Sequence, residues 1–316
     1  MENFRKSVSK NFQNFLKFFK LRRQPVVIYY SFQDFFFCEK LLNVLGHTFL
    51  LNPKHPPNRL TKINGVLNQV TNFILLVLLL ISIFQSIRGG FVYVVLENIL
   101  VLGSFTTSLF KVYMVFHKNL GKIFEVIEKL NEHFPHSHAD QFVYNVSSNF
   151  HVLHKMYIIY NIAYYTLIPQ FCSMPFVFQI YAAYKSIDLE WETILAFNLG
   201  FNQLRPVVFE LIYIVEAWFI IFSVYYILGS DLLYANMVQI LSMEFEILGQ
   251  MIKDIDFNNN EEKVLMDHKR LVNIHQELIE VSEKLNEIFS PLILINAFAS
   301  IAGLCSTSFL SVVTKF

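Results

Sequence analysis

The sequence has 316 residues, of which 54% are hydrophobic and 16% are charged, and its 25 basic and 25 acidic side chains balance to a net charge of zero. Soluble domains carry about 25% charged residues, so this composition excludes a water-soluble globular protein and indicates a surface that faces lipid. Three widely spaced cysteines, Cys38, Cys172 and Cys305, match neither a disulfide framework nor a metal-ligand pattern, and we interpret them as buried thiols.

Residues 1–65 are predicted to form a cytosolic amino-terminal segment with interfacial helices. The first 62 residues hold 11 basic and 3 acidic side chains. No early apolar run is followed by a small-residue cleavage site, so the sequence predicts no secretory signal peptide. Phenylalanines alternate with Lys and Arg between Phe4 and Phe19, which favours a helix lying in the membrane interface. A disordered basic tail is the alternative.

Five stretches are long and apolar enough to cross a hydrocarbon core of ~30 Å, which takes about 20 helical residues. They are Val66–Ile87, Phe91–Phe116, Met156–Tyr184, Pro206–Leu233 and Ser290–Val313. Gly89 and Gly90 separate the first two, and glycine permits the tight reversal that a helical hairpin over residues 66–116 requires. The predicted fold class is therefore all-α, a polytopic membrane helical bundle with cytosolic helical extensions.

The distribution of Lys and Arg over the connections predicts the orientation, because basic loops stay in the cytosol during insertion. The loop at residues 117–155 has four lysines and the loop at 234–289 has five basic residues, whereas 185–205 has two basic residues beside three acidic ones. The amino terminus and the loops 117–155 and 234–289 are therefore predicted to be cytosolic, and 185–205 extracellular. Asn145 begins a glycosylation acceptor sequence, but its cytosolic position predicts that it stays unmodified.

Both long cytosolic loops carry helical periodicity, because their apolar residues recur at steps of three and four. These residues are Leu120, Ile123, Ile127, Leu130 and Phe134 in the first loop, Met237, Ile240, Leu241, Ile247, Leu248 and Met251 in the extension of span four, and Leu271, Ile274, Leu278, Val281, Leu285 and Ile288 before span five. The pattern predicts three long helices that form a bundle below the membrane. Packing within one chain and an additional subunit interface both remain open. Asp256–Glu262 is a polar break, either a hinge or an exposed loop.

The sequence contains no phosphate loop, nucleophile elbow, zinc-protease helix or dinucleotide fingerprint, so it predicts no enzyme, no catalytic residue and no cofactor. His133, His136 and His138 form a histidine cluster, but no acidic or thiol residue accompanies them at metal-ligand spacing. We interpret the cluster as a solvated helix end and predict no metal site.

The outer halves of spans two, three and four combine aromatic side chains with a few small polar groups, which is the composition of a pocket for a small apolar ligand. The candidate lining residues are Phe91, Tyr93, Thr166, Phe171, Ser173, Met174, Phe178, Phe209, Tyr213 and Trp218. Ordinary interhelical packing is the alternative for each of them. Pro169 and Pro175 are expected to kink span three and to widen the cavity at its outer end.

Ionisable side chains inside spans are functional candidates, because charge is costly in hydrocarbon. Lys111 and Asp231 lie toward the cytosolic ends of their spans, where snorkelling to the interface explains them. Glu97 and Glu216 lie deeper. Two interpretations stay open for these two: pairing or a water-filled cavity, and an inward-facing carboxyl that is protonated or hydrogen-bonded.

The stretch from His275 to Phe309, HQELIEVSEKLNEIFSPLILINAFASIAGLCSTSF, resembles the fifth-span signature of insect odorant receptors. The residues that carry this resemblance are His275, Phe289, Ser290, Leu304, Cys305 and Phe309. Span four with its extension, from Pro206 to Leu248, and the stretch HKNLGKIFEVIEKLNEHFP after span two are similar to the same family.

This resemblance implies a tetrameric ligand-gated cation channel of the plasma membrane with seven spans per subunit and a cytosolic amino terminus. It implies a hetero-oligomer of an odour-tuned subunit with a shared coreceptor subunit, in which a small volatile organic ligand sits among the outer halves of the spans. The seventh span of that family lines the pore, and its cytosolic helices form an anchor between subunits. Phe316 follows the fifth span directly, so spans six and seven are expected to be absent.

The resulting functional hypothesis is an odorant receptor, the odour-tuned subunit of such a channel in olfactory signal transduction. A gustatory receptor of the same superfamily, a G-protein-coupled receptor with the opposite topology, and a non-functional truncated copy are the alternatives. The expected partners are the lipid bilayer, the odorant and the coreceptor, and no nucleic acid.

Overall fold

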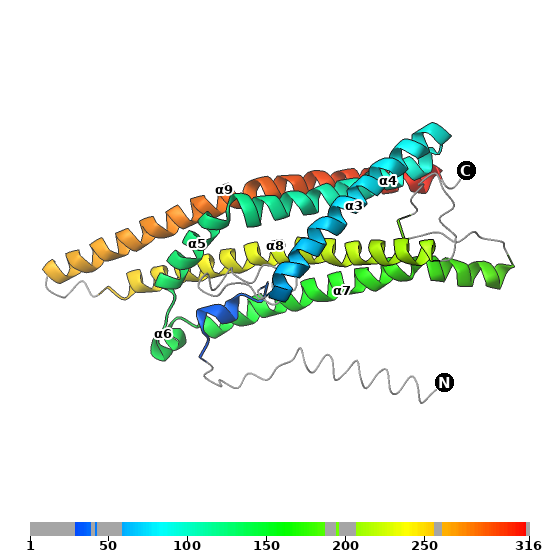
Figure 1. The fold of residues 1–316 in the computed structure, drawn as a ribbon. Coiled ribbons are helices and arrows are strands. Elements are labelled where there is room, and N and C mark those ends of the chain that lie inside the picture. Colours follow the sequence, from blue (N-terminus) through cyan, green and yellow to red (C-terminus); the bar gives the residue numbers. More distant parts are fainter. Residues whose placement is uncertain are drawn as a thin grey trace, which may run out of the picture.

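The computed structural model describes residues 29–38, 42, 59–186, 194–195, 207–255 and 261–313, and leaves the side chains of residues 60–62, 93 and 310–313 undescribed. The described residues form helices and no strand (Figure 1). The elements are η1 (Phe32–Phe35), α3 (Arg59–Gly89), α4 (Val92–Val112), η2 (Tyr113–Lys118), α5 (Leu120–His133), α6 (His138–Val143), α7 (Val146–Lys185), α8 (Val208–Lys253) and α9 (Glu261–Val313). The predicted all-α bundle is confirmed. The predicted interfacial helix near Phe4–Phe19 and residues 256–260 of the predicted polar break Asp256–Glu262 lie outside the described residues, whereas Glu261 and Glu262 form the first turn of α9.

Within the described part of the chain, four helical stretches are long and apolar enough to cross a membrane. They are Ile63–Gly89 in α3, Val94–Lys118 across α4 and η2, Val208–Lys253 in α8 and Glu261–Phe309 in α9. The first predicted span lies within the first of these stretches, and the second, fourth and fifth predicted spans overlap the other three. The third predicted span lies in α7, which is one continuous helix through Pro169 and Pro175 but is not among these four. The tyrosines and glutamines of α7 lower its hydropathy, and its membrane crossing stays a prediction.

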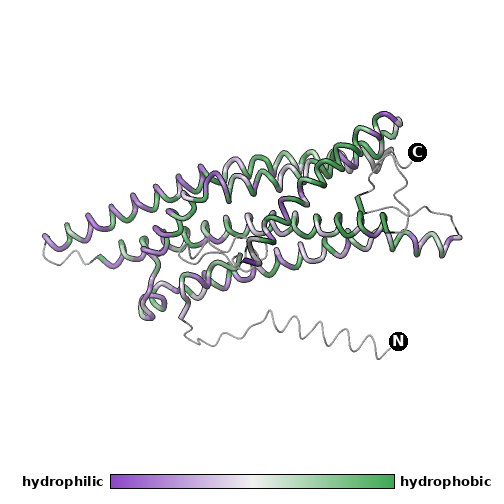
Figure 2. The backbone as a smooth tube through the Cα atoms, viewed as in Figure 1, coloured by the Kyte–Doolittle hydropathy of each residue, from purple (hydrophilic) through white to green (hydrophobic). Residues whose placement is uncertain are grey.

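Large apolar side chains cover the outside of the membrane-level helices. Phe73 on α3 is 68% exposed, Ile180 on α7 is 71% exposed and Leu294 on α9 is 59% exposed. Figure 2 shows the hydrophobic residues along α3, α4 and the adjoining parts of α8 and α9, and hydrophilic residues toward the end of α9 that lies beside α5. An apolar outer surface of this kind is stable in lipid and not in water.

The helical hairpin predicted over residues 66–116 is present, because α3 and α4 pack against each other (Figure 1). It turns at Gly90, whose φ of +73° is a left-handed conformation that favours glycine. At its other end α4 continues into η2, a π-helical turn in which the Asn119 N–H donates to the Met114 carbonyl at 3.0 Å. From there α5 departs from the direction of α4. We call the end of the bundle with Gly90 the hairpin end and the opposite end the α5 end.

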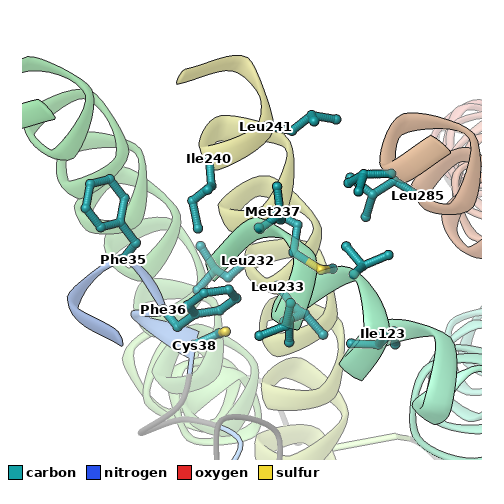
Figure 3. Packing of buried hydrophobic residues seen from close by; sticks show 14 of the residues in the cluster. Phe35, Phe36, Cys38, Ile123, Leu232, Leu233, Met237, Ile240, Leu241 and Leu285 are labelled. Atoms are coloured by element: carbon teal, nitrogen blue, oxygen red, sulfur yellow. The ribbon is translucent and has the colours of Figure 1, made fainter. Parts of the chain in front are cut away.

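At the α5 end, α5 and the adjoining halves of α8 and α9 pack on one another through the predicted seam positions (Figure 3). The buried seam residues are Ile123, Ile127, Leu130 and Phe134, Met237, Ile240, Leu241, Ile247 and Leu248, and Leu271, Leu278, Val281, Leu285 and Ile288. Leu120, Ile274 and Met251 are partly buried against the same cluster. The helical extensions are thus confirmed, and their apolar stripes form the core of a three-helix coil.

Three ion pairs and a contact between His133 and Glu277 flank this coil between α5 and α9. Lys122 pairs with Glu287, Glu125 with Lys284, Lys129 with Glu280 and His133 with Glu277. Each step forward along α5 is matched by a step backward along α9, which is the register of two antiparallel helices. All of these side chains are partly or largely exposed, so each pair contributes little to stability, and the set acts mainly on register.

Glu244 is the acidic residue that interrupts the apolar seam of α8. Its side chain is 3% exposed, and its Oε1 has no hydrogen-bond partner among the described residues. Burial raises the pKa of Glu244 to about 9, so the carboxyl is protonated near neutral pH. The periodicity that marks Leu241 and Leu248 as seam positions also includes Glu244, but the sequence prediction did not count this acidic residue as buried.

The segment Tyr29–Cys38 docks against α6, α7 and the loop before α6. The Gln141 side chain binds both backbone groups of Tyr30: its Oε1 accepts from the Tyr30 N–H at 3.0 Å, and its Nε2 donates to the Tyr30 carbonyl at 2.7 Å. The ring of Tyr30 stacks on that of Phe150 at 4.1 Å, and Phe37 stacks on Tyr157 at 5.0 Å. This segment therefore extends the core of the α5 end.

Candidate ligand-binding site

An aromatic cluster joins α7 to α8 near the hairpin end. The Tyr213 hydroxyl on α8 donates to the Cys172 carbonyl on α7, and the ring of Phe176 packs edge-on against Tyr213 with centroids 5.5 Å apart. Phe209 lies one turn before Tyr213 on α8, with ring centroids 6.1 Å apart. Pro175 and Cys172 lie together within this stretch of α7, and Pro175 is buried. Of the predicted lining residues, Phe209 and Tyr213 share this contact region.

The other predicted lining residues are more dispersed. Phe91, Thr166, Phe171, Ser173, Met174, Phe178 and Trp218 are exposed in the single chain, and the side chain of Tyr93 lies outside the described residues. Trp218 packs on Phe222 of its own helix at 4.7 Å. The hydroxyls of Thr166 and Ser173 donate to carbonyls within α7, those of Ala163 and Gln170. A ligand role for this set therefore stays a prediction.

A shallow hollow of about 380 Å³ lies on α7. It is lined by Tyr157, Ile158, Asn161, Ile162, Tyr165 and Thr166, of which Thr166 was the one predicted. Tyr157, Asn161 and Tyr165 recur every four residues and so share one helix face. That spacing is visible in the sequence, but Tyr157, Asn161 and Tyr165 lie in the inner half of the predicted span, whereas the pocket was predicted in the outer halves.

Glu216 is fully buried on α8, and its Oε2 accepts a hydrogen bond of 3.2 Å from the backbone N–H of Leu195, in the segment between α7 and α8. Glu97 on α4 is half-buried. The Glu216 carboxyl is thus inward-facing and hydrogen-bonded, and a pairing or water-cavity role for Glu216 and Glu97 stays a prediction. Glu216 thus ties the loop between α7 and α8 to the hairpin end of α8.

Polar and aromatic contacts also join α3, α4 and α8 at this end. The Asn98 amide donates to the Ser82 hydroxyl at 2.8 Å, linking α4 to α3, and both residues are fully buried. Phe105 on α4 packs against Phe219 on α8 with ring centroids 5.2 Å apart. Neither contact was predicted, because each depends on which faces of two helices meet.

The comparisons with known proteins are consistent with one family. The model of the 7tm odorant receptor family matches residues 92–315. The chain belongs to this odorant receptor family. Odorant receptor 49a of Drosophila melanogaster is 23% identical over 298 residues, which cover 90% of this chain and 73% of that receptor. The function of the present chain is therefore that of a receptor, and its family is not a family of enzymes.

Two solved structures share the fold of this receptor. The insect olfactory receptor OR5 from Machilis hrabei aligns with a TM-score of 0.67 at 16% identity, over 86% of this chain and 69% of that one. The same receptor in complex with eugenol aligns with a TM-score of 0.64 at 17% identity, over 85% and 68% of the two chains. At these identities the likeness shows the fold alone.

The family-signature residues of the receptor divide between the coil and the membrane-level part of α9. His275 contacts the ring of Phe245 on α8 at 6.2 Å, and buried Phe289 packs on Tyr234 of α8 at 4.8 Å. Ser290, Leu304, Cys305 and Phe309 are exposed. Cys305 is thus not a buried thiol, and Cys172 is half-buried, so the prediction of three buried thiols holds for Cys38 alone. An apolar environment for Cys305 comes from lipid or from another helix rather than from this chain's core.

The three histidines of the predicted cluster contact separate partners. His133 Nε2 lies 2.8 Å from Glu277 on α9, His136 Nε2 lies 2.9 Å from the Asn131 carbonyl, and the ring of His138 lies beside Tyr29. Glu277 reaches His133 from a distant part of the sequence, so the spacing within the cluster could not show this contact. Among the described residues, no group of three metal-ligating side chains is assembled.

The prediction that Lys111 snorkels to the interface is also wrong. Its side chain is 1% exposed, and its Nζ lies 2.7 Å from Asp231 Oδ1 on α8. The two charges therefore neutralise each other inside the receptor, with Asp231 31% exposed. The pairing was missed because each charge was judged on its own helix.

Proposed function

We propose that this receptor is the odour-tuned subunit of a heteromeric ligand-gated cation channel that also contains a coreceptor subunit. Its ligand is a small volatile organic compound bound among the outer halves of α4, α7 and α8. The observation that supports this site is the contact of Tyr213 with Phe176, Phe209 and the Cys172 carbonyl, which combines rings with few polar groups at the hairpin end. The Machilis receptor of the same fold was solved with eugenol.

The proposed location is the plasma membrane, with a cytosolic amino terminus. The basic residues support this orientation, because the segment before α3 and the connections that contain α5, α6 and the start of α9 are rich in Lys and Arg. The three-helix coil is then cytosolic, and the hairpin end is extracellular. An epitope at Met1 is expected to resist labelling on intact cells, whereas its labelling from outside would support the topology of a G-protein-coupled receptor.

Ligand binding changes the channel only through a difference in affinity between its closed and open arrangements. α8 is one helix of 46 residues that carries Tyr213 near its outer end and coil residues such as Met237 beyond its middle. A shift of α8 at the ligand site is therefore carried along a rigid rod toward the cytosol.

Replacing Tyr213 by alanine is expected to lower ligand sensitivity roughly tenfold, the loss that follows from an aromatic contact worth about 1.5 kcal/mol. The measurement is the whole-cell current of cells that co-express the receptor with an insect coreceptor, over a panel of volatile compounds that begins with eugenol. Phe73→Ala is the control, because Phe73 is 68% exposed and lies on α3, whereas the cluster is formed by residues of α7 and α8.

The control variant and the wild type are expected to respond alike. If no compound evokes a current from receptor that is present at the cell surface, the receptor is a non-conducting chain and the proposed function is wrong. If Tyr213→Ala and Phe73→Ala shift the response equally, the channel assignment stands but the ligand does not bind beside Tyr213.

A further inference from the structure

An ion pair between Lys111 and Asp231 joins α4 to α8. Lys111 is 1% exposed and Asp231 is 31% exposed, with 2.7 Å between nitrogen and oxygen. A charge at this depth is costly when it stands alone, and the cost rises when its partner is removed and the remaining charge stays buried. The pair therefore holds the two helices at one defined level.

Polar side chains from two further helices lie beside this pair. Asn68 on α3 is 1% exposed and lies against Tyr226 on α8. Tyr164 on α7 lies within electrostatic range of Asp231. All of these residues belong to the inner parts of their predicted spans. α8 is thus held by α3, α4 and α7 at the same level of the bundle.

The pair also marks a border between two parts of α4. On the hairpin side, Phe105 packs against Phe219 of α8. On the other side, η2 begins two residues after Lys111 and leads into α5. The ion pairs between α5 and α9 set the register of these two helices. A π-helical turn is a common site of bending and is often functional. α8, in contrast, passes this border without a break.

We propose that Lys111 and Asp231 form a clamp that transmits movement between the outer ligand site and the cytosolic coil. The clamp fixes α4 to α8 between the hairpin end and the α5 end. A displacement of α8 relative to α4 on the hairpin side therefore becomes a displacement of η2 and α5 on the other side. Lys111 and Asp231 are positioning residues in this role, and neither touches the ligand. This role rests on the proposed ligand site, whereas the contact between Lys111 and Asp231 does not depend on which compound binds.

The test compares amide hydrogen exchange in the purified full-length chain without ligand, for wild type, Lys111→Met, Asp231→Asn and the exchanged pair Lys111→Asp with Asp231→Lys. Each single variant is expected to accelerate exchange roughly tenfold or more in α5, at Leu120–His133, and in the outer part of α8. The exchanged pair restores the attraction and is expected to return both regions toward wild-type rates. Lys122→Met is the control, since its pair with Glu287 is exposed on both sides.

Three outcomes would overturn the clamp. In the first, the single variants accelerate exchange only in the turns next to Lys111 and Asp231, as a merely local contact would. In the second, hydrogen exchange in the double variant is as fast as in the single variants, or the double variant does not fold. Either result would show that charge attraction between the two residues is not the cause. In the third, Lys122→Met accelerates exchange in α5 and outer α8 as much as Lys111→Met does.

Discussion

Replacing Leu278 by alanine is expected to destabilise the receptor by about 2–5 kcal/mol. Leu278 is fully buried in the middle of the coil, where α9 packs against α5 and α8. The shorter side chain loses transfer free energy and leaves a cavity that the surrounding helices fill only in part. The measurement is the midpoint of thermal loss of helical circular dichroism for protein purified in detergent.

Leu265→Ala provides the matched control, because Leu265 lies on the same helix and is 53% exposed. It removes the same atoms from a position where little surface is buried, so its midpoint should stay close to that of the wild type. Equal losses for the two variants would mean that the three-helix coil does not form the stable core described above.

The coil could be predicted because its signal is local in the sequence. Apolar residues at steps of three and four require a helix with one buried face, wherever that helix comes to lie. Leu278 and Met237 were both placed in a seam on this ground, and both are fully buried. The membrane-level helices could be predicted for the same kind of reason, since length and hydropathy are properties of one segment.

The contacts between helices could not be predicted in the same way. Lys111 and Asp231 are 120 residues apart, and the sequence contains no signal that α4 and α8 meet on the faces that carry them. The ion pairs between α5 and α9 could not be predicted for the same reason. Glu125 contacts Lys284 only because the two helices are antiparallel and in one register. Snorkelling was a reasonable reading of Lys111 on an isolated helix, and the neighbouring helix made it wrong.

The candidate ligand site lies between these two cases. Aromatic composition pointed to the outer part of α8, where Tyr213 contacts Phe209 of the same helix and Phe176 of α7, and the ligand role of these residues stays a prediction. Composition does not give the rotation of a helix about its axis, so the same argument included Phe171 and Phe178, which are exposed. A pocket is defined by faces that converge, and convergence is a tertiary property.

Replacing Glu244 by leucine is expected to stabilise the receptor by roughly 3 kcal/mol near pH 7. The folded protein holds this carboxyl in an apolar seam where burial raises its pKa to about 9 from an ordinary 4.5, whereas the unfolded chain ionises it freely. A pKa that is raised in the folded state makes an acid destabilising at every pH above its unfolded value, because the unfolded state releases the proton first. Leucine removes this destabilisation and adds apolar surface to the seam.

The sign of this effect gives a pH dependence that identifies its cause. As pH rises from 4.5 toward 9, the wild type should lose stability relative to Glu244→Leu by about 1.4 kcal/mol per pH unit, and the difference should level off above that window. Thermal midpoints of the two proteins at about pH 5 and about pH 8 measure it, with Glu283→Leu on the exposed face of α9 as the control. A stability difference that stays constant over this range would show that leucine acts by packing alone. It would also mean that the Glu244 carboxyl is ionised or paired in the folded receptor.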